Sequence, residues 1–263
     1  MKKALTIAGS DSGGGAGIQA DLKTFAAHGV FGTTAITAIT AQNTRGVTAM
    51  QALPADLVTA QIEAVVEDIG VDAVKTGMLA TAAIVSAVAA AAEALELPYL
   101  VVDPVMVAKS GDALLEQEAI EAVKFELLPR TYVLTPNALE AASLTGMPVT
   151  NVAEAHEAAR ALHRLGARAC VITGGHIDGP QVIDLLFDGR HFIELSGPRL
   201  STPHTHGTGC TFAAAIAANL ALGRTLEEAV RAAKAYVTGA IRHAPGIGSG
   251  HGPINHIWQQ SKP

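Results

Sequence analysis

The sequence predicts an α/β fold in which helices cover both faces of a mainly parallel central sheet. Short β-branched or apolar runs alternate regularly with helical patterns along the chain. Hydrophobic residues make up 49% of the sequence but aromatic residues only 4%, so the core must consist of Ala, Val, Leu and Ile, which suits helices packed on a parallel sheet. The 26 glycines are too many for a helical bundle, and they indicate tight turns and backbone-lined ligand sites.

The expected elements alternate in type along the chain. Strands are predicted at 3–8, 31–40, 47–53, 73–76, 99–103, 132–135, 168–173, 182–187 and 191–195. Helices are predicted at 17–28, 54–69, 81–97, 116–128, 137–145, 152–165, 208–222 and 225–243. Pro54 lies near a first helical turn, and Asp188-Gly189 signals a hairpin between the last two strands. Because there is no linker, repeat or shift in composition, we expect one domain over residues 1–263.

Charge and composition exclude several classes of protein. The net charge is −6 and no run of Lys or Arg stands out, which argues against nucleic acid as a partner. The apolar run that follows the basic start breaks at Gly9, too early for a signal peptide, and Ser and Glu interrupt the Ala-rich stretch 82–97, so it is no membrane span. Cys170 and Cys210 are expected to be free thiols in a reducing cytosol, which predicts a cytoplasmic protein.

The glycine-rich segment 9–17 follows the first predicted strand. It is not a Walker A loop, because Gly15 stands where Lys is required, and it is not a Rossmann fingerprint, because strand 31–40 ends without an acidic residue. A tight turn that needs positive φ would explain the glycines equally well. Asp21, one turn into the following helix, could fix a polar substrate if a pocket lies beside it.

A second glycine-rich turn, 206–211, opens an apolar helix. Glycines just before a helix leave backbone N–H groups free to bind an anion, and the helix dipole favours negative charge there. A thiol at Cys210 would then have a lowered pKa. The alternative is that Cys210 is a small apolar residue at a buried helix start, as Cys170 is expected to be in its strand. His206 is expected only to flank this turn.

Two further segments offer polar groups at strand ends, where ligands bind in sheets of this kind. Asn137 and Glu140 lie on one helix face and could position a hydrated Mg²⁺, although a capping box is an alternative explanation. Gln42 presents an amide donor and acceptor, which match the edge of an aminopyrimidine, although an ordinary polar loop would look similar.

Taken in order, these segments resemble the hydroxymethylpyrimidine/phosphomethylpyrimidine kinases of bacterial thiamine synthesis, which belong to the ribokinase-like superfamily. The matching motifs lie at 7–24, 37–44, 75–78, 103–106, 108–111, 134–137, 207–210, 247–248 and 250–253. The resemblance covers residues 3–257, and it implies a single ribokinase-like domain.

The resemblance also implies an activity and roles for individual residues. Members transfer a phosphate from ATP to 4-amino-5-hydroxymethyl-2-methylpyrimidine and then phosphorylate the monophosphate, with Mg²⁺ as cofactor and a homodimer as the expected assembly. The implied pyrimidine site is Gln42 with Gly9, Asp21, Met78 and Val105. The implied anion hole is Gly207, Thr208, Gly209 and Cys210, with Cys210 as the base, and Glu140 would lie near Mg²⁺. Asn137, Lys109 and Thr173 would lie on the ATP side.

One departure and two alternatives remain. Many members carry Lys where this chain has Thr173, so Lys109 or another cation must compensate, or ATP binds less tightly. A pyridoxal or pyridoxine kinase shares the implied fold, and a non-catalytic vitamin-binding protein is the alternative from another class. The intact glycine–cysteine turn argues against the non-catalytic alternative, because a pure binder needs no anion hole. We expect no second fused thiamine enzyme.

Overall fold

The computed structural model describes residues 1–107, 114, 116–177 and 179–260, and one sheet organises them. Its strands are β1 (Lys3–Asp11), β2 (Phe31–Asn43), β3 (Gly46–Ala52), β4 (Ala73–Thr76), β5 (Leu100–Val102), β6 (Val133–Leu134), β7 (Ala169–Ile172), β8 (Gln181–Phe187) and β9 (Phe192–Pro198). Their order across the sheet is β3-β2-β1-β4-β5-β6-β7-β8-β9. Every pair from β2 to β7 is parallel, whereas β3, β8 and β9 run antiparallel to the strands before them.

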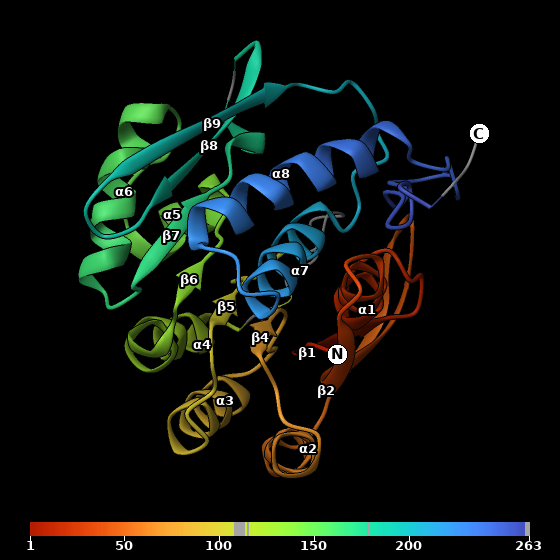
Figure 1. Cartoon of the computed structure of the whole chain (residues 1–263), viewed down its shortest axis with the longest axis vertical. Helices are drawn as coiled ribbons and strands as arrows, with labels where there is room; N and C mark the ends of the chain where they lie inside the picture. The colour runs from red at the N-terminus through yellow and green to blue at the C-terminus, as the bar shows by residue number, and fades with distance from the viewer. Residues whose placement is uncertain (108–113, 115, 178, 261–263) are drawn as a thin grey trace.

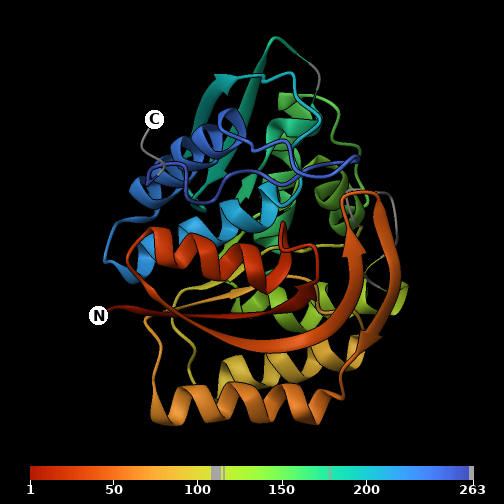
Figure 2. The same ribbon diagram turned by 90° about the vertical axis from the view of Figure 1, so that its right-hand side faces the viewer.

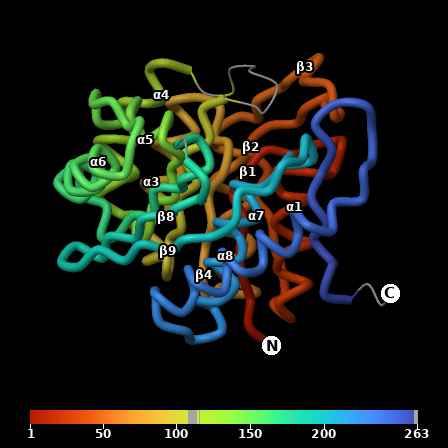
Figure 3. The backbone as a smooth tube through the Cα atoms, turned by 90° about the horizontal axis from the view of Figure 1, so that it is seen from above, coloured from red at the N-terminus to blue at the C-terminus, as the bar shows by residue number. Residues whose placement is uncertain are grey.

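Helices cover both faces of this sheet (Figures 1 and 3), as the alternating pattern predicted. The helices are α1 (Gly17–Ala27), α2 (Ala55–Asp68), α3 (Ala82–Ala94), α4 (Gln117–Ala122), α5 (Ala138–Thr145), α6 (Val152–Arg164), α7 (Thr208–Ala221) and α8 (Leu226–Arg242). Helices α2 to α6 contribute to one hydrophobic cluster, and α1, α7 and α8 contribute to another on the opposite face. The described residues therefore form a single α/β domain.

Small apolar side chains allow this close packing. In α7 every residue from Thr211 to Ala221 is buried, and six of these residues are Ala. The strands β4 and β7 are buried along their whole length, which agrees with the continuous apolar runs that parallel sheets require. At one edge, β2 and β3 form a long hairpin that extends past the central strands (Figure 2).

The structure differs from the predicted elements in a few places. The helix expected at 116–128 is α4 followed by a π-helix, Val123–Leu127, and a 3-10 turn, Leu128–Arg130. Pro129 has no N–H to donate, and in an α-helix its ring would clash with the carbonyl of Phe125, so the helix changes form before it ends.

No helix within the described residues combines the length and the apolarity that spanning a bilayer requires.

Candidate active site

A cleft of about 1000 Å³ opens where the central parallel strands end. Carboxyl ends of parallel strands meet at one edge of a sheet, so segments far apart in the sequence converge there. The predicted site residues that line it are Gly9, Gln42, Met78, Val105, Asn137, Glu140, Thr173, Gly207, Thr208, Gly209 and Cys210. Lys109 lies outside the described residues. The structure therefore brings most of the predicted residues into one cavity.

Asp21 is the exception, because it lies beneath the cleft. Its side chain has no exposed surface and accepts a hydrogen bond from the Thr6 hydroxyl at 2.6 Å. Its two oxygens lie 3.1 and 2.9 Å from the ammonium nitrogen of Lys75. A carboxylate that is enclosed in this way cannot line a substrate pocket, so that expectation is wrong. Asp21 instead holds Lys75 in place.

Lys75 connects Asp21 to the cleft floor. Its side chain is fully buried, and its ammonium lies 3.9 Å from Oδ2 of Asp103, a residue that lines the cleft. Among the described residues, that oxygen has no hydrogen-bond partner, although it is buried. Burial raises the pKa of Asp103 to about 6, since Lys75 offsets only part of the effect and Asp21 adds to it. At neutral pH the Asp103 carboxyl is therefore mostly ionised.

The Cys210 thiol lies close enough to the Asp103 carboxyl to lower the pKa of that carboxyl, against the effect of burial. Burial raises the pKa of Cys210 to about 12, with the Lys75 cation opposing this shift and the carboxyls of Asp103 and Asp21 reinforcing it. The expectation of a lowered thiol pKa at this helix N-terminus is therefore wrong for the protein without ligands. The reason is that burial disfavours the thiolate more than the Lys75 cation favours it, and the Asp103 carboxyl adds to the effect of burial.

Helix α7 begins at the turn that the sequence singled out. Its N-cap, Gly207, has φ +83° and no side chain with which to cap the helix. A side chain there would overlap the carbonyl oxygen of Gly15, so glycine is required for both conformation and space. Thr208 donates both its hydroxyl and its backbone N–H to the Thr205 carbonyl, at 2.7 and 3.3 Å. Within the described residues, the N–H groups of Gly209 and Cys210 have no backbone partner, and both residues line the cleft. This turn has the geometry of an anion site.

Asn137 and Glu140 form the capping box of α5. The Asn137 side chain accepts N–H bonds from Leu139 and Glu140, and the Glu140 carboxylate accepts the Asn137 N–H at 2.8 Å. Burial, together with the nearby Asp103 carboxyl, raises the pKa of Glu140 to about 8. A buried carboxyl group with a second one near it in the same cleft suits a hard divalent cation, which prefers such oxygen ligands. The residues present therefore fit Mg²⁺.

Gln42 lies at the β2 end of the cleft, beside β1. Its side-chain oxygen lies 3.2 Å from the hydroxyl of Thr40, which is also 2.9 Å from the carbonyl of Ser10. Met78 is almost fully buried next to Gly9, where any larger residue would collide with the Met78 methyl group. This end of the cleft thus combines an amide with a flat apolar wall.

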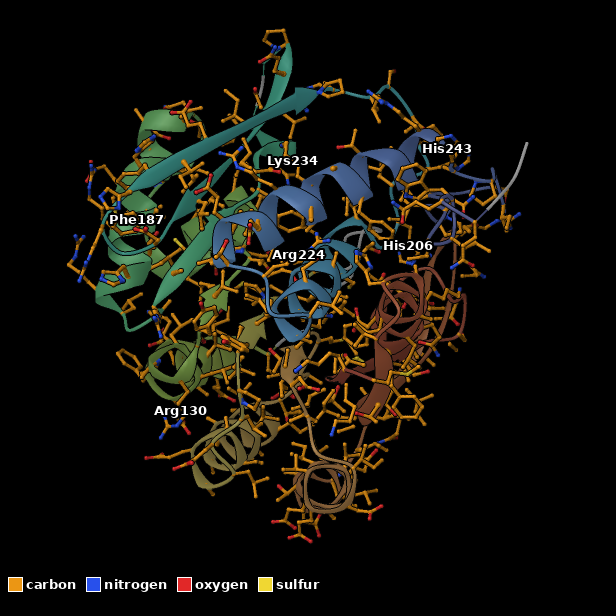
Figure 4. All side chains as sticks on the ribbon, viewed as in Figure 1. Arg130, Phe187, His206, Arg224, Lys234 and His243 are labelled. Atoms are coloured by element: carbon orange, nitrogen blue, oxygen red, sulfur yellow. The ribbon has the colours of Figure 1, made fainter. Side chains whose placement is uncertain are left out.

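The opposite end of the cleft lies at β7 to β9. The Thr173 N–H donates to the Pro136 carbonyl at 2.9 Å, which brings Thr173 beside Asn137. Arg199 donates to three backbone carbonyls of the segment 175–179. Lys234 on α8 (Figure 4) donates to Asp184 at 2.7 Å, and Asp184 also accepts the Gly174 N–H. Two cations that the sequence had not indicated therefore lie at this end.

Residues 11–255 match the profile of the family described as phosphomethylpyrimidine kinase. The chain belongs to this family. It is 50% identical over 267 residues to a hydroxymethylpyrimidine/phosphomethylpyrimidine kinase of Haemophilus influenzae, covering 100% of this chain and 98% of that one. It is 51% identical over 253 residues to a thiamine biosynthesis bifunctional protein of Geobacter sulfurreducens, where the match covers 96% of this chain but 52% of the relative. The chain thus spans about half the length of that bifunctional relative.

Solved structures of vitamin kinases share the fold of this family member. An ADP complex of Bacillus subtilis pyridoxal kinase gives a TM-score of 0.93 at 42% identity, with 100% of both chains covered. Staphylococcus aureus pyridoxal kinase in complex with AMP-PCP and pyridoxal gives a TM-score of 0.91 at 39% identity, covering 98% of this chain and 94% of that one. The ribokinase-like fold that the resemblance implied is confirmed.

Sequence reasoning missed several residues of this kinase site. Asp103 directly follows β5 within a motif that carried the resemblance, so its place after a strand end was the available signal. Lys75 gave no signal of its own, because its partner Asp21 is 54 residues away in the chain. His206, expected only to flank the turn, contacts Asp11 at 2.9 Å.

Proposed function

We propose that this chain transfers the terminal phosphoryl group of ATP to 4-amino-5-hydroxymethyl-2-methylpyrimidine and then phosphorylates the monophosphate to the diphosphate. The observation that carries the proposal is one cleft that holds an amide-bearing apolar end at Gln42 and an open helix N-terminus at Gly207. Membership of the phosphomethylpyrimidine kinase family supports the reaction. The chain matches only about half of the bifunctional relative, so the proposal does not extend to the second activity of that relative.

The pyrimidine binds at the β2 end. The Gln42 amide donates to a ring nitrogen and accepts from the amino group, while Gly9, Met78 and Val105 contact the flat ring. Asp21 contributes from below through Lys75, since it has no surface in the cleft. This arrangement orients the hydroxymethyl group toward the first turn of α7.

The backbone N–H groups of Gly207, Thr208, Gly209 and Cys210 stabilise the charge on the transferred phosphoryl group. As the substrate oxygen bonds to the terminal phosphorus, its O–H bond breaks and the bond from phosphorus to the bridging oxygen of ADP breaks. The released proton passes to the sulfur of Cys210, while the thiol proton passes to the Asp103 carboxylate. Cys210 thus takes part in proton transfer as a relay, and Asp103 carries the charge.

The nucleotide occupies the β7 to β9 end, beside Asn137 and Thr173. The charge that Thr173 lacks comes from Lys234, held by Asp184, and from Lys109 in the undescribed segment. Glu140 would hold Mg²⁺, directly or through water, and the ion would neutralise charge on the ATP phosphates when it is bound. The similar kinases solved with ADP and with AMP-PCP support nucleotide binding by this chain.

Phosphorylation of pyridoxal is the second candidate activity. Two pyridoxal kinases superimpose on this chain with TM-scores of 0.93 and 0.91, so the scaffold does not separate the substrates. Curated relatives at about 50% identity carry the pyrimidine-kinase name, which favours the pyrimidine. We also propose a cytoplasmic homodimer that binds no nucleic acid. Sedimentation equilibrium checks the assembly, and a monomeric mass at micromolar concentration contradicts it.

Steady-state kinetics test the substrate assignment. We expect the pyrimidine to be phosphorylated with ATP and Mg²⁺ at a higher kcat/KM than pyridoxal, and tenfold preference for pyridoxal would reverse the assignment. Gln42→Leu keeps the side-chain volume but leaves the polar edge of the pyrimidine unpaired, which costs about 1–3 kcal/mol of recognition. The variant should therefore raise KM for the pyrimidine roughly tenfold or more while KM for ATP stays constant. Unchanged kinetics for the pyrimidine would remove Gln42 from the site.

A further inference from the structure

Three chain segments that are distant in the sequence meet at His206, which directly precedes the N-cap of α7. They are the glycine-rich loop 11–16, the turn 205–210 and the C-terminal segment 246–254. The His206 side chain is mostly buried, and Figure 4 shows it between α1 and the end of α8. Neither its place in the motif nor the proposed chemistry explains why a histidine stands there.

Asp11 is the first partner of His206. One Asp11 oxygen lies 2.9 Å from Nε2 of His206 and also accepts the N–H groups of Gly15 and Ala16, at 3.0 and 2.8 Å. The other oxygen accepts the Gly13 N–H at 2.8 Å. One carboxylate therefore fixes the whole glycine-rich loop, and His206 joins that loop to α7.

The C-terminal segment is the second partner. The His206 N–H donates to the Gly252 carbonyl at 3.1 Å, and the Ile254 N–H donates back to the His206 carbonyl at 3.4 Å. A few residues earlier, the His251 N–H donates to the Thr44 carbonyl at 2.7 Å, at the tip of the β2–β3 hairpin. Figure 2 shows this segment, in dark blue, reaching the hairpin.

Glycines make this path possible. A side chain at Gly248 or Gly250 would overlap Thr44, so only glycine allows the segment to pass so close to the hairpin. Thr44 lies two residues beyond Gln42. The C-terminal segment therefore connects the pyrimidine end of the cleft, at Gln42, to the turn that opens α7.

We propose that His206 is a positioning residue that holds the Gly207–Cys210 turn in register with the pyrimidine pocket, through Asp11 on one side and the C-terminal segment on the other. The substrate named in this inference rests on the proposed function, whereas the contacts of His206 are those of this chain alone. The side chain of His206 acts on the reaction by fixing where the backbone N–H groups of α7 point. A displacement of those groups by about 1 Å is enough to reduce a phosphoryl-transfer rate on the order of 100-fold.

Two substitutions at one position test the proposal. His206→Ala removes the ring and its contact with Asp11, whereas His206→Gln keeps an N–H donor that can reach the Asp11 carboxylate. We expect His206→Ala to lower kcat about 100-fold with KM for the pyrimidine within threefold of the wild type. We expect His206→Gln to recover at least a third of the wild-type kcat.

A matched control separates positioning from general stability. His28→Ala also removes a half-buried ring, one that contacts the Thr24 carbonyl at 2.8 Å and packs edge-on against Tyr236, at the far end of α1. Its kcat should equal that of the wild type even if its melting temperature falls. A kcat for His206→Ala within threefold of the wild type overturns the proposal, as does an equal loss of kcat in His28→Ala.

Amide hydrogen exchange without ligands keeps the inference independent of the substrate. In His206→Ala, and in His206→Gln to a lesser extent, peptides over 207–212 and 44–46 should exchange faster than in the wild type, while those over β7 stay unchanged. Wild-type protein that fails to phosphorylate the pyrimidine contradicts the proposed function only. Unchanged exchange at 207–212 in both variants contradicts the positioning role, whatever the substrate.

Discussion

At the scale of single residues, the chemistry of the site depends on whether Asp103 or Cys210 carries the negative charge beside Lys75. Lys75 is fully buried and shared between Asp21 and Asp103, and the Cys210 thiol lies beside Asp103. With a pKa of about 6 for Asp103 and about 12 for Cys210, the carboxyl is ionised and the thiol neutral at pH 7. Cys210 could act as a thiolate base only if the pKa of its thiol lay below the pKa of Asp103. A proton relay through the neutral thiol therefore agrees better with these protonation states.

The two mechanisms, a proton relay from Cys210 to Asp103 and a Cys210 thiolate that acts as the base, predict that different variants remain active. We expect Asp103→Asn to lower the single-turnover rate by about 10²–10⁴-fold, the usual contribution of a general base. Cys210→Ser should keep more activity than Cys210→Ala, because a hydroxyl can pass a proton on but cannot act as a base at neutral pH. Quenched-flow measurement of phosphoryl transfer gives these rates. An active Asp103→Asn together with equally inactive Ser and Ala variants would establish Cys210 as the base itself.

Glu140 supplies a prediction about stability. Its pKa is near 4.5 in the unfolded chain and about 8 in the folded protein, so the folded state holds the proton more tightly. The stabilisation that this proton gives is complete below pH 4.5 and is lost as the pH rises toward 8. Glu140→Gln keeps the capping box but has no proton to lose.

Denaturant unfolding of both proteins, without metal or nucleotide, measures this difference. The variant should match the wild type near pH 5 and exceed its free energy of unfolding by about 2–4 kcal/mol at pH 8. A difference that stays constant across this range would mean that Glu140 is ionised throughout.

At the scale of elements, the N-terminus of α7 depends on its glycine. Gly207 has φ +83° and lies against the Gly15 carbonyl, whereas Gly223, just after α7, has φ +87° and no atom within 4 Å of the position a side chain would take. An Ala at either site pays the left-handed strain of about 1–2 kcal/mol, but only Gly207→Ala also collides with a neighbour.

Comparing Gly207→Ala with Gly223→Ala separates the effect of moving the anion hole from the effect of backbone strain alone. We expect Gly223→Ala to lose stability while keeping its kcat, and Gly207→Ala to lose about 100-fold in kcat because the turn must move. Thermal unfolding and steady-state kinetics measure the two effects. Equal kcat values for both variants would show that the reaction tolerates displacement of this turn.

At the scale of the whole molecule, local patterns predicted the layers and the edge of the sheet where the site lies. Each parallel strand is indicated by its own apolar run, and each glycine-rich turn by its own residues. Predicting these elements therefore needed no information about contacts between distant parts of the chain. The links between segments were not predictable in this way. Asp11 and His206 are 195 residues apart, and Lys75 and Asp21 are 54 apart, so neither pairing leaves a local pattern. The raised pKa values of Cys210 and Glu140 follow first from burial in the folded cleft, which no local pattern indicates, and so the pKa of Cys210 was predicted in the wrong direction.

The two ends of the cleft belong to opposite halves of the sheet. Gln42 lies on β2 and Thr173 follows β7, with β1, β4, β5 and β6 between these two strands. The N-terminus of α7 lies between the two ends, where the two proposed ligands would meet. Each ligand alone should therefore order its own end of the molecule, whereas the turn at 207–212 should need both.

Hydrogen exchange followed by mass spectrometry tests this division. The pyrimidine alone should slow exchange in peptides over 9–17 and 40–46, and AMP-PCP with Mg²⁺ alone should slow it over 179–185 and 197–202. Peptides over 207–212 should reach full protection only with both ligands present, because the substrate hydroxyl and the terminal phosphate meet there. At 100 times its Kd, each ligand stabilises the folded protein by about 2.7 kcal/mol, enough to be seen in matched melting experiments. Equal protection of both ends by either ligand alone would mean that the cleft closes as one unit and that the two ends are not independent.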